Sequence, residues 1–313
     1  MQLRLIFMGT PELAGTSLQM LLRAPELKVV AVVTQQDQPK GRGLKLQPSP
    51  VKEIALREAL PVLQPERARD EKFLAELRAF QPDLIAVAAY GQILPQGILD
   101  LPRLGCLNVH TSLLPKYRGA APIQRAIWDG ETETGVTIMR MDAGLDTGAM
   151  LTQTKTPIHD ADNAQTLHDR LAQLGAELLV STIPDYAAGK ILPRPQPAEG
   201  VSYAPKIKKS DGQIDWRQPA RAIRNQLRAL TPWPGAFTHL PGPPPALLKI
   251  WDADLWEPSG PHGEVLRVDK SGIVVGCGAG ALQILSLQRE GGRRLGAAEF
   301  LAGHPLPVGQ KLE

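Results

Sequence analysis

The spacing of apolar residues between positions 3 and 183 constrains the fold more than any other feature of this chain. Runs that are apolar at nearly every position, such as LKVVAVVT at 27–34, alternate with stretches of helical period. Such continuous runs are typical of strands buried on both faces of a parallel sheet. The expected strands are 3–8, 27–34, 83–88, 105–110, 135–141 and 149–158, and the expected helices are 13–22, 50–59, 71–80 and 163–183. We therefore predict a doubly wound, Rossmann-like, mostly parallel α/β sheet with right-handed crossovers, whose last two strands form a hairpin.

The hydrophobic pattern of the sequence changes after a proline-rich segment, LPRPQPAEGV at 192–201. The prolines of this segment favour an extended spacer. A helix is expected at 219–230. Short β-rich runs punctuated by glycine and proline follow it at 246–252, 263–269, 272–277 and 281–287. This pattern is typical of a small antiparallel barrel. We predict a first domain at 1–189, a linker at 190–205 and a small OB-like β-barrel domain at 206–313.

Several classes of protein are disfavoured by what the sequence lacks. The two cysteines at 106 and 277 form neither a disulfide framework nor a metal-ligand pair, and the six histidines show no ligand spacing. No apolar window approaches the roughly 18 residues of a membrane span, and the start does not resemble a signal peptide. No G-x-G-x-x-G follows the first strand, which disfavours nicotinamide cofactors. We predict a cytoplasmic protein that uses no metal and binds no membrane.

Polar side chains interrupt one of the apolar strands, at CLNVHTSLLP from 106 to 115. Asn108 and His110 leave the same face of this strand because side chains alternate. They lie at its carboxyl end, where open α/β sheets bind ligands. Ser112–Pro115 then combines a hydroxyl, two apolar side chains and a rigid turn, which suits the rim of a partly apolar pocket. A satisfied polar pair or an ordinary strand-end cap is the alternative.

A second candidate element is MDAGLDTG at 141–148, which carries two acids after a strand. Asp146 is the acid that we expect to be held inward, beside Asn108 and His110. Asp142 is the alternative acid. Taken alone, Asp-Thr-Gly also fits a plain turn.

Positive charge is concentrated in the second part of the chain. Residues 1–200 carry 21 Lys and Arg against 22 Asp and Glu, a net −1, and residues 201–313 carry 14 against 10, a net +4. Seven of these cations crowd together, at Lys206, Lys208, Lys209, Arg217, Arg221, Arg224 and Arg228. In the helix at 219–230 three arginines share a face opposite the apolar positions, so we expect that face to meet phosphates. The clustering predicts a polyanionic partner, with a merely solvated surface as the alternative.

Residues 35–49, QQDQPKGRGLKLQPS, form a segment of 15 residues without periodicity between a strand and a helix. Loops of this length in compact domains tend to be functional or disordered. Lys40, Arg42 and Lys45 lie among glycines, so we expect them to order on a phosphate backbone. From composition alone, a solvated loop fits equally well.

Taken in their order and spacing, these motifs resemble the methionyl-tRNA formyltransferases. The resemblance rests on NVH at 108, SLLP at 112, RGAAPIQ at 118, ETGVTI at 133 and GLDTG at 144, with TQ at 34, GRG at 41, PSPVK at 48, IDW at 214 and WP at 233. It covers nearly the whole chain. Thr111 is a departure, because the family usually has Gly there, and we expect it to narrow the space next to His110.

The resemblance implies the formyltransferase fold and a reaction in translation initiation. A formyl group moves from the co-substrate 10-formyltetrahydrofolate to the α-amino group of initiator methionyl-tRNA. The implied catalytic residues are Asn108, His110 and Asp146, the implied folate-binding residues are Ser112, Leu113, Leu114 and Pro115, and the implied tRNA-binding residues are Lys40, Arg42, Lys45, Lys206, Lys208 and Lys209. A monomer without an obligate protein partner is also implied.

The chemistry of such a transfer suits these residue types. A neutral amine must attack a formyl carbonyl, and an oxyanion forms; the amine titrates near pH 8 and must lose a proton. We expect Asp146 to move protons and orient His110, and His110 as imidazolium and the Asn108 amide to stabilise the oxyanion. A formyltransferase for a small amine, a formyl-folate hydrolase and a non-catalytic RNA-binding module are the alternatives. The last leaves the three catalytic side chains unexplained.

Overall fold

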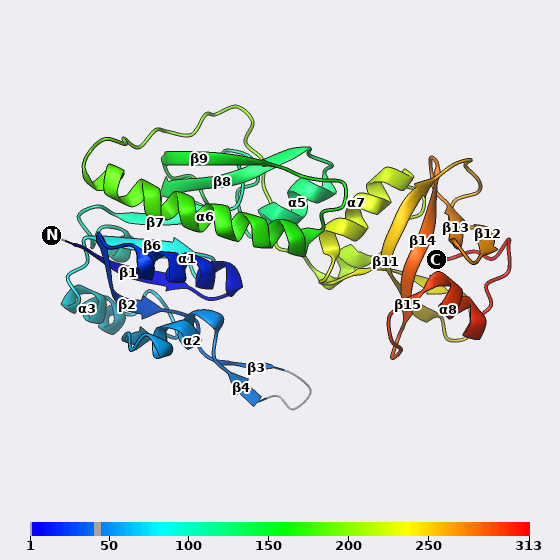
Figure 1. Cartoon of the computed structure of the whole chain (residues 1–313), viewed down its shortest axis with the longest axis horizontal. Helices are drawn as coiled ribbons and strands as arrows, with labels where there is room; N and C mark the ends of the chain where they lie inside the picture. The colour runs from blue at the N-terminus through cyan, green and yellow to red at the C-terminus, as the bar shows by residue number, and fades with distance from the viewer. Residues whose placement is uncertain (1, 41–44) are drawn as a thin grey trace. The chain divides into compact units, whose positions relative to one another are not determined.

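The computed structural model of the chain describes residues 2–40 and 45–313 (Figure 1). They form two compact units. The first comprises Met1–Pro122, Glu133–Pro157 and His168–Ala204, and the second comprises Ile123–Thr132, Ile158–Leu167 and Pro205–Glu313. The domain limits at 189 and 206 stay a prediction.

The first unit is built on a seven-stranded sheet in the order β5-β2-β1-β6-β7-β8-β9, in which β8 is antiparallel to both of its neighbours, β7 and β9, and the other neighbouring strands pair in parallel. Its strands are β1 (Leu3–Gly9), β2 (Leu27–Val33), β5 (Val62–Leu63), β6 (Leu84–Ala88), β7 (Cys106–His110), β8 (Glu133–Arg140) and β9 (Met150–Pro157). β6, at its centre, is buried at every position, as expected for a strand covered on both faces. The predicted mostly parallel sheet with a terminal hairpin is confirmed.

Helices cover both faces of this sheet: α1 (Glu12–Arg23), α2 (Pro50–Arg57), α3 (Glu71–Ala79), α4 (Gln96–Leu99) and α6 (Ala164–Ala187). Gly175 of α6 lies so close to Val109 that a Cβ there would come within 2.7 Å of it. On the opposite face, the Cys106 thiol reaches the carbonyl of Ile98 in α4 at 3.5 Å. Because side chains alternate along β7, Asn108 and His110 share the face of Cys106 and point away from α6.

The second unit holds a six-stranded antiparallel sheet in the order β10-β11-β14-β13-β12, with β15 paired to β14. Its elements are α5 (Pro122–Trp128), the 3₁₀ helix η1 (Lys209–Gly212), α7 (Ala220–Leu230), β10 (Ala236–Leu240), β11 (Ala246–Trp256), β12 (Val265–Asp269), β13 (Gly272–Gly276), β14 (Ala281–Arg289), β15 (Leu295–Gly296) and α8 (Ala297–Gly303). The apolar stripe of α7, with Ile223 and Leu227, packs into the core beside Trp216. The predicted antiparallel second part is confirmed.

Two short strands lie within the segment 35–49, β3 (Gln38–Lys40) and β4 (Lys45–Gln47). They form an antiparallel hairpin, and strands of three residues are too short to show a period. Lys52 anchors its base, because the ammonium donates to both carboxylate oxygens of Asp37 at 2.9 and 2.8 Å. The predicted tRNA contact Arg42 lies outside the described residues, and so do the side chains of Lys40 and Lys45.

Candidate active site

His110, the last residue of β7, is held between two oxygen atoms. Its ring is buried, with 5% of the side chain exposed. Nε2 lies 2.9 Å from the main-chain oxygen of Tyr117. A carbonyl oxygen only accepts, so Nε2 carries a hydrogen and donates it. Nδ1 faces Oδ2 of Asp146 at 3.6 Å. Both ring nitrogens thus face oxygen atoms of the protein.

Asp146 is brought to His110 by contacts from distant parts of the chain. The Gly119 N–H donates to Oδ2 of Asp146 at 2.8 Å. The carboxamide of Gln196 donates to the main-chain oxygens of Asp146 and Gly148 at 2.7 and 2.8 Å, and it accepts from the Arg118 guanidinium. These contacts hold Asp146 in the left-handed backbone region, at φ +52°, which few non-glycine residues adopt.

Gly119 is required at its position for two reasons. Its φ is +116°, and a Cβ there would lie 2.8 Å from the oxygen of Ala204. A side chain would therefore push Gly119, whose N–H holds Asp146, away from the Ala204 carbonyl. Gln196, by contrast, gave no signal in the sequence, because it lies in the proline-rich stretch that reads as a linker.

Asn108 is half-buried in β7, between Val87 of β6 and Met139 of β8. Among the residues that the structure describes, none bonds to its carboxamide. Leaving a buried amide unpaired costs about 1–3 kcal/mol. A half-buried amide on the same face as His110 is therefore suited to donate to a ligand oxygen.

Asp142, the alternative acid, is used differently. Its Oδ1 accepts from the Thr147 hydroxyl at 2.7 Å and from the Gly144 N–H at 3.1 Å, on the exposed side of the loop. The structure thus places Asp146 beside His110 and gives Asp142 a turn-stabilising role. The assignment of catalytic roles to Asn108, His110 and Asp146 stays a prediction.

The segment Ser112–Pro115, expected to meet the folate, is rigid because its polar groups bond within the protein. The Ser112 hydroxyl donates to the carbonyl of Lys116 at 2.6 Å. Thr137 Oγ1 donates to the Ser112 carbonyl and accepts from the Leu114 N–H, and Gln153 donates to the Leu114 carbonyl. Leu113 and Pro115 keep partly exposed side chains, and they are the surfaces left for a ligand. Folate contact at Ser112, Leu113, Leu114 and Pro115 stays a prediction.

The residue that departs from the family pattern, Thr111, is buried with 8% of its surface exposed. It follows His110 directly in the chain. The expected narrowing beside the imidazole stays a prediction.

The basic residues of the second unit fall into two groups. Lys206, Lys208 and Lys209 are exposed and form no ion pair with any described residue. Arg224 instead donates to the Asp160 carboxylate at 2.9 Å, and Arg228 to the carbonyls of His159 and Asp162. Arg224 and Arg228 thus already have partners within the protein, and the prediction that this face of α7 meets phosphates stays a prediction. Their partners lie in the segment 158–162, which is distant in sequence. The helical period of α7 carries no information about that segment.

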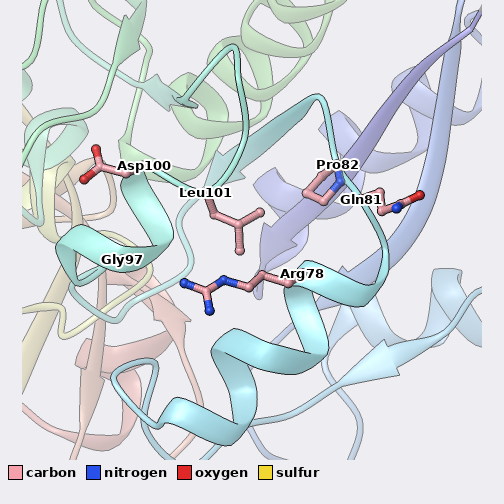
Figure 2. A pocket seen from close by; sticks show the side chains of 6 residues that line it. All are labelled: Arg78, Gln81, Pro82, Gly97, Asp100 and Leu101. Carbon is pink, nitrogen blue, oxygen red and sulfur yellow. The ribbon is translucent and has the colours of Figure 1, made fainter.

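The first unit also has a hollow in its surface. It has a volume of about 350 Å³ and is lined by Arg78, Gln81, Pro82, Gly97, Asp100 and Leu101. Figure 2 shows Arg78 and Leu101 extending into the space between α3 and α4. Gln81 and Pro82 precede β6, so the hollow opens at the amino edge of the parallel strands. His110 lies at the carboxyl edge, where ligands of open α/β sheets bind.

Two kinds of feature are absent from the described residues, 2–40 and 45–313. None of their helices has the length and apolar character needed to cross a membrane. None of their His, Cys, Asp and Glu side chains cluster in threes or more in a way that suits a metal ion.

Comparison with known proteins assigns the fold of the first unit. The family model described as formyl transferase matches residues 3–183. The chain belongs to the formyl transferase family. A second model, described as formyl transferase, C-terminal domain, matches residues 206–305.

Relatives in sequence are similar over their whole length. A protein of Trichlorobacter lovleyi named methionyl-tRNA formyltransferase is 53% identical over 309 residues, which are 99% of this chain and 96% of that protein. One of Geobacter sulfurreducens with the same name is 51% identical over 310 residues, 99% of this chain and 96% of that protein. Among solved structures, the N-formyltransferase of Helicobacter canadensis in complex with folinic acid and dTDP-3-aminofucose has a TM-score of 0.65 at 19% identity, over 94% of this chain and 100% of that chain. At this identity the likeness concerns the fold alone.

Proposed function

We propose that this formyl transferase moves the formyl group of 10-formyltetrahydrofolate to the α-amino group of initiator methionyl-tRNA. The observation that carries the proposal is the level and extent of sequence identity. Relatives named methionyl-tRNA formyltransferase are 51–53% identical over 99% of this chain. The identity therefore extends over both matched regions, 3–183 and 206–305. Translation initiation is the process that such an activity serves.

The reaction requires stabilisation of an oxyanion, removal of a proton from the amine and return of a proton to N10. The side chains around His110 suit these roles. The amine nitrogen bonds to the formyl carbon, the carbonyl becomes an oxyanion, and the bond from that carbon to N10 of the folate then breaks. The free carboxamide of Asn108 and the ring of His110 are donors for the oxyanion, and one such donor typically contributes about 3–4 kcal/mol. Asp146, fixed by Gly119, takes the proton that the amine loses, and a proton returns to N10 of the leaving folate.

The co-substrate is expected to lie against Leu113 and Pro115. Their side chains are partly exposed beside a segment whose main chain is already bonded, so binding would cost little reorganisation. Asn108 lies near the end of β7, just before this segment, and its carboxamide has no partner among the described residues. A ligand oxygen near this amide would be consistent with that. Relatives in fold have been solved in complex with folates, among them the N-formyltransferase of Helicobacter canadensis with folinic acid.

The tRNA is expected to contact both units. Lys206, Lys208 and Lys209 supply exposed cations without carboxylate partners among the described residues. The segment 35–49, which contains Lys40, Arg42 and Lys45, supplies a second group of cations by the family pattern. We further propose a cytoplasmic monomer that works without an obligate protein partner.

One experiment separates this function from its alternatives. Purified protein is incubated with 10-formyltetrahydrofolate and with charged initiator or elongator methionyl-tRNA, and formylmethionine and formate are measured. We expect formyl transfer to the initiator tRNA. Formate release without an acceptor would identify a hydrolase, and formylation of a small amine alone would identify a different transferase; either result contradicts the proposal.

A further inference from the structure

The second unit contains a cavity that none of the roles above uses. Its volume is about 390 Å³, within the range of about 300–1,000 Å³ typical of small-molecule sites. It is lined by Arg125 and Trp128 of α5, Ser210 and Asp211 of η1, Gln213, Asp215 and Gln218 of the following turn, and Ala222, Ile223 and Gln226 of α7. All of these residues belong to the second unit.

Arg125 is the unusual member of this lining. Its guanidinium carbon lies 4.9 Å from the centre of the Trp128 ring. Its Nε is buried and has no hydrogen-bond partner, and none of the described residues forms an ion pair with the guanidinium. Arg224 and Arg228 on nearby α7 are both bonded to carboxylate or carbonyl oxygens. A buried unpaired donor is costly, so Arg125 is suited to a ligand that supplies an acceptor.

The other groups in the wall indicate what kind of ligand fits. An indole ring beside a guanidinium is a stacking surface for a planar ring. Ser210, Gln213 and Gln218 carry hydroxyl and amide groups, which suit the edges of a base. The carboxylates of Asp211 and Asp215 disfavour a free anion, but they accept hydrogen bonds from ribose hydroxyls. Arg217 beside Asp215 lowers the pKa of that carboxyl to about 2, so it is ionised at neutral pH.

Exposed lysines directly precede one of the cavity residues in the sequence. Ser210 follows Lys208 and Lys209 directly, and both lysines are exposed. Phosphates that flank a nucleotide in the cavity would therefore find cations close along the chain. We infer that this cavity binds one unstacked nucleotide of the tRNA, with its base on Trp128. The inference rests on the proposed function, because it needs tRNA as the substrate.

Replacing Trp128 by Ala tests the stacking contact. Stacking of one base on an aromatic ring corresponds to about fivefold to 150-fold in affinity, so the KM for methionyl-tRNA should rise by such a factor while kcat stays the same. Trp128→Phe should recover most of the loss. Trp256→Ala is the matched control, because Trp256 has an arginine, Arg267, 5.3 Å from its ring centre in the same unit but does not line the cavity. A KM for Trp128→Ala equal to that of Trp256→Ala would overturn the inference.

A second measurement uses the unaltered protein and so does not depend on the folding of a variant. Methionyl-tRNA containing 4-thiouridine is irradiated in complex with the wild-type chain, and crosslinked peptides are identified by mass spectrometry. We expect crosslinks in the peptides that contain residues 125–128 or 210–218. Crosslinks elsewhere only would contradict the inference. Its failure is distinct from that of the proposed function, because wild-type protein would still formylate the initiator tRNA.

Discussion

Replacing Asp146 by Asn removes the charge that faces His110 and leaves an oxygen for the Gly119 N–H. With His110 as the imidazolium that the proposed reaction uses, two unit charges 3.6 Å apart, the distance between Nδ1 and Oδ2, attract by about 4–5 kcal/mol at an effective dielectric of about 20. That energy corresponds to about 10³-fold in rate. Loss of a positioned acid–base group gives a similar range, about 10² to 10⁴. We therefore expect kcat of Asp146→Asn to fall by about 10²- to 10⁴-fold.

The assay follows formyl transfer to initiator methionyl-tRNA at saturating concentrations of both substrates, with thermal unfolding measured on the same samples. Asp142→Ala is the matched control in the same loop. It loses two hydrogen bonds on an exposed surface, so its free energy of unfolding should fall by about 1 kcal/mol. Its kcat should stay within about twofold of the wild type. A kcat for Asp146→Asn equal to that of Asp142→Ala would refute the role given to Asp146.

Three further predictions concern the rest of the molecule. Replacing the three lysines of 206–209 by Gln should weaken tRNA binding and reduce the slope of log affinity against log salt by about 2–3; an unchanged slope in a salt titration would contradict their contact with phosphates. Lys52→Met breaks the bidentate pair with Asp37 at the base of the β3–β4 hairpin, so the KM for tRNA should rise with little change in kcat, and equal KM values would exclude a positioning role. Burial raises the pKa of the Cys106 and Cys277 thiols to about 12 from an ordinary value of 9; both should resist thiol reagents at pH 8 until the protein unfolds. Because these pKa values are raised, the stability that they contribute is complete below about pH 9 and is lost as the pH rises towards 12. Rapid labelling of the native protein would contradict the burial.

The parts of the fold that depend on local pattern were predictable from the sequence. The strands at 27–34 and 105–110 were found because continuous apolar runs identify buried parallel strands. The common face of Asn108 and His110 followed from the two-residue period of a strand. In each case the decisive information lies within a few residues of the feature itself.

The contacts that complete the site were not predictable in this way. Asp146 is held by Gly119 and Gln196, which lie 27 and 50 residues away along the chain. The partners of Arg224 and Arg228 were not predictable either. The pattern of α7 separates its apolar face from its basic face, but it does not show that Asp160 and the carbonyls of His159 and Asp162 lie against the basic face. The β3–β4 hairpin was not predictable for a different reason, since strands of three residues are too short to show a period.

The central claim is that Asn108 and His110 stabilise the oxyanion formed during the transfer. The most direct test is the single-turnover rate of formyl transfer by Asn108→Ala and His110→Ala, with tetrahydrofolate affinity measured in parallel. We expect each rate to fall by about 10²-fold or more while folate affinity changes little, because the lost donors act in the transition state. A single-turnover rate near that of the wild type in either variant would contradict the claim.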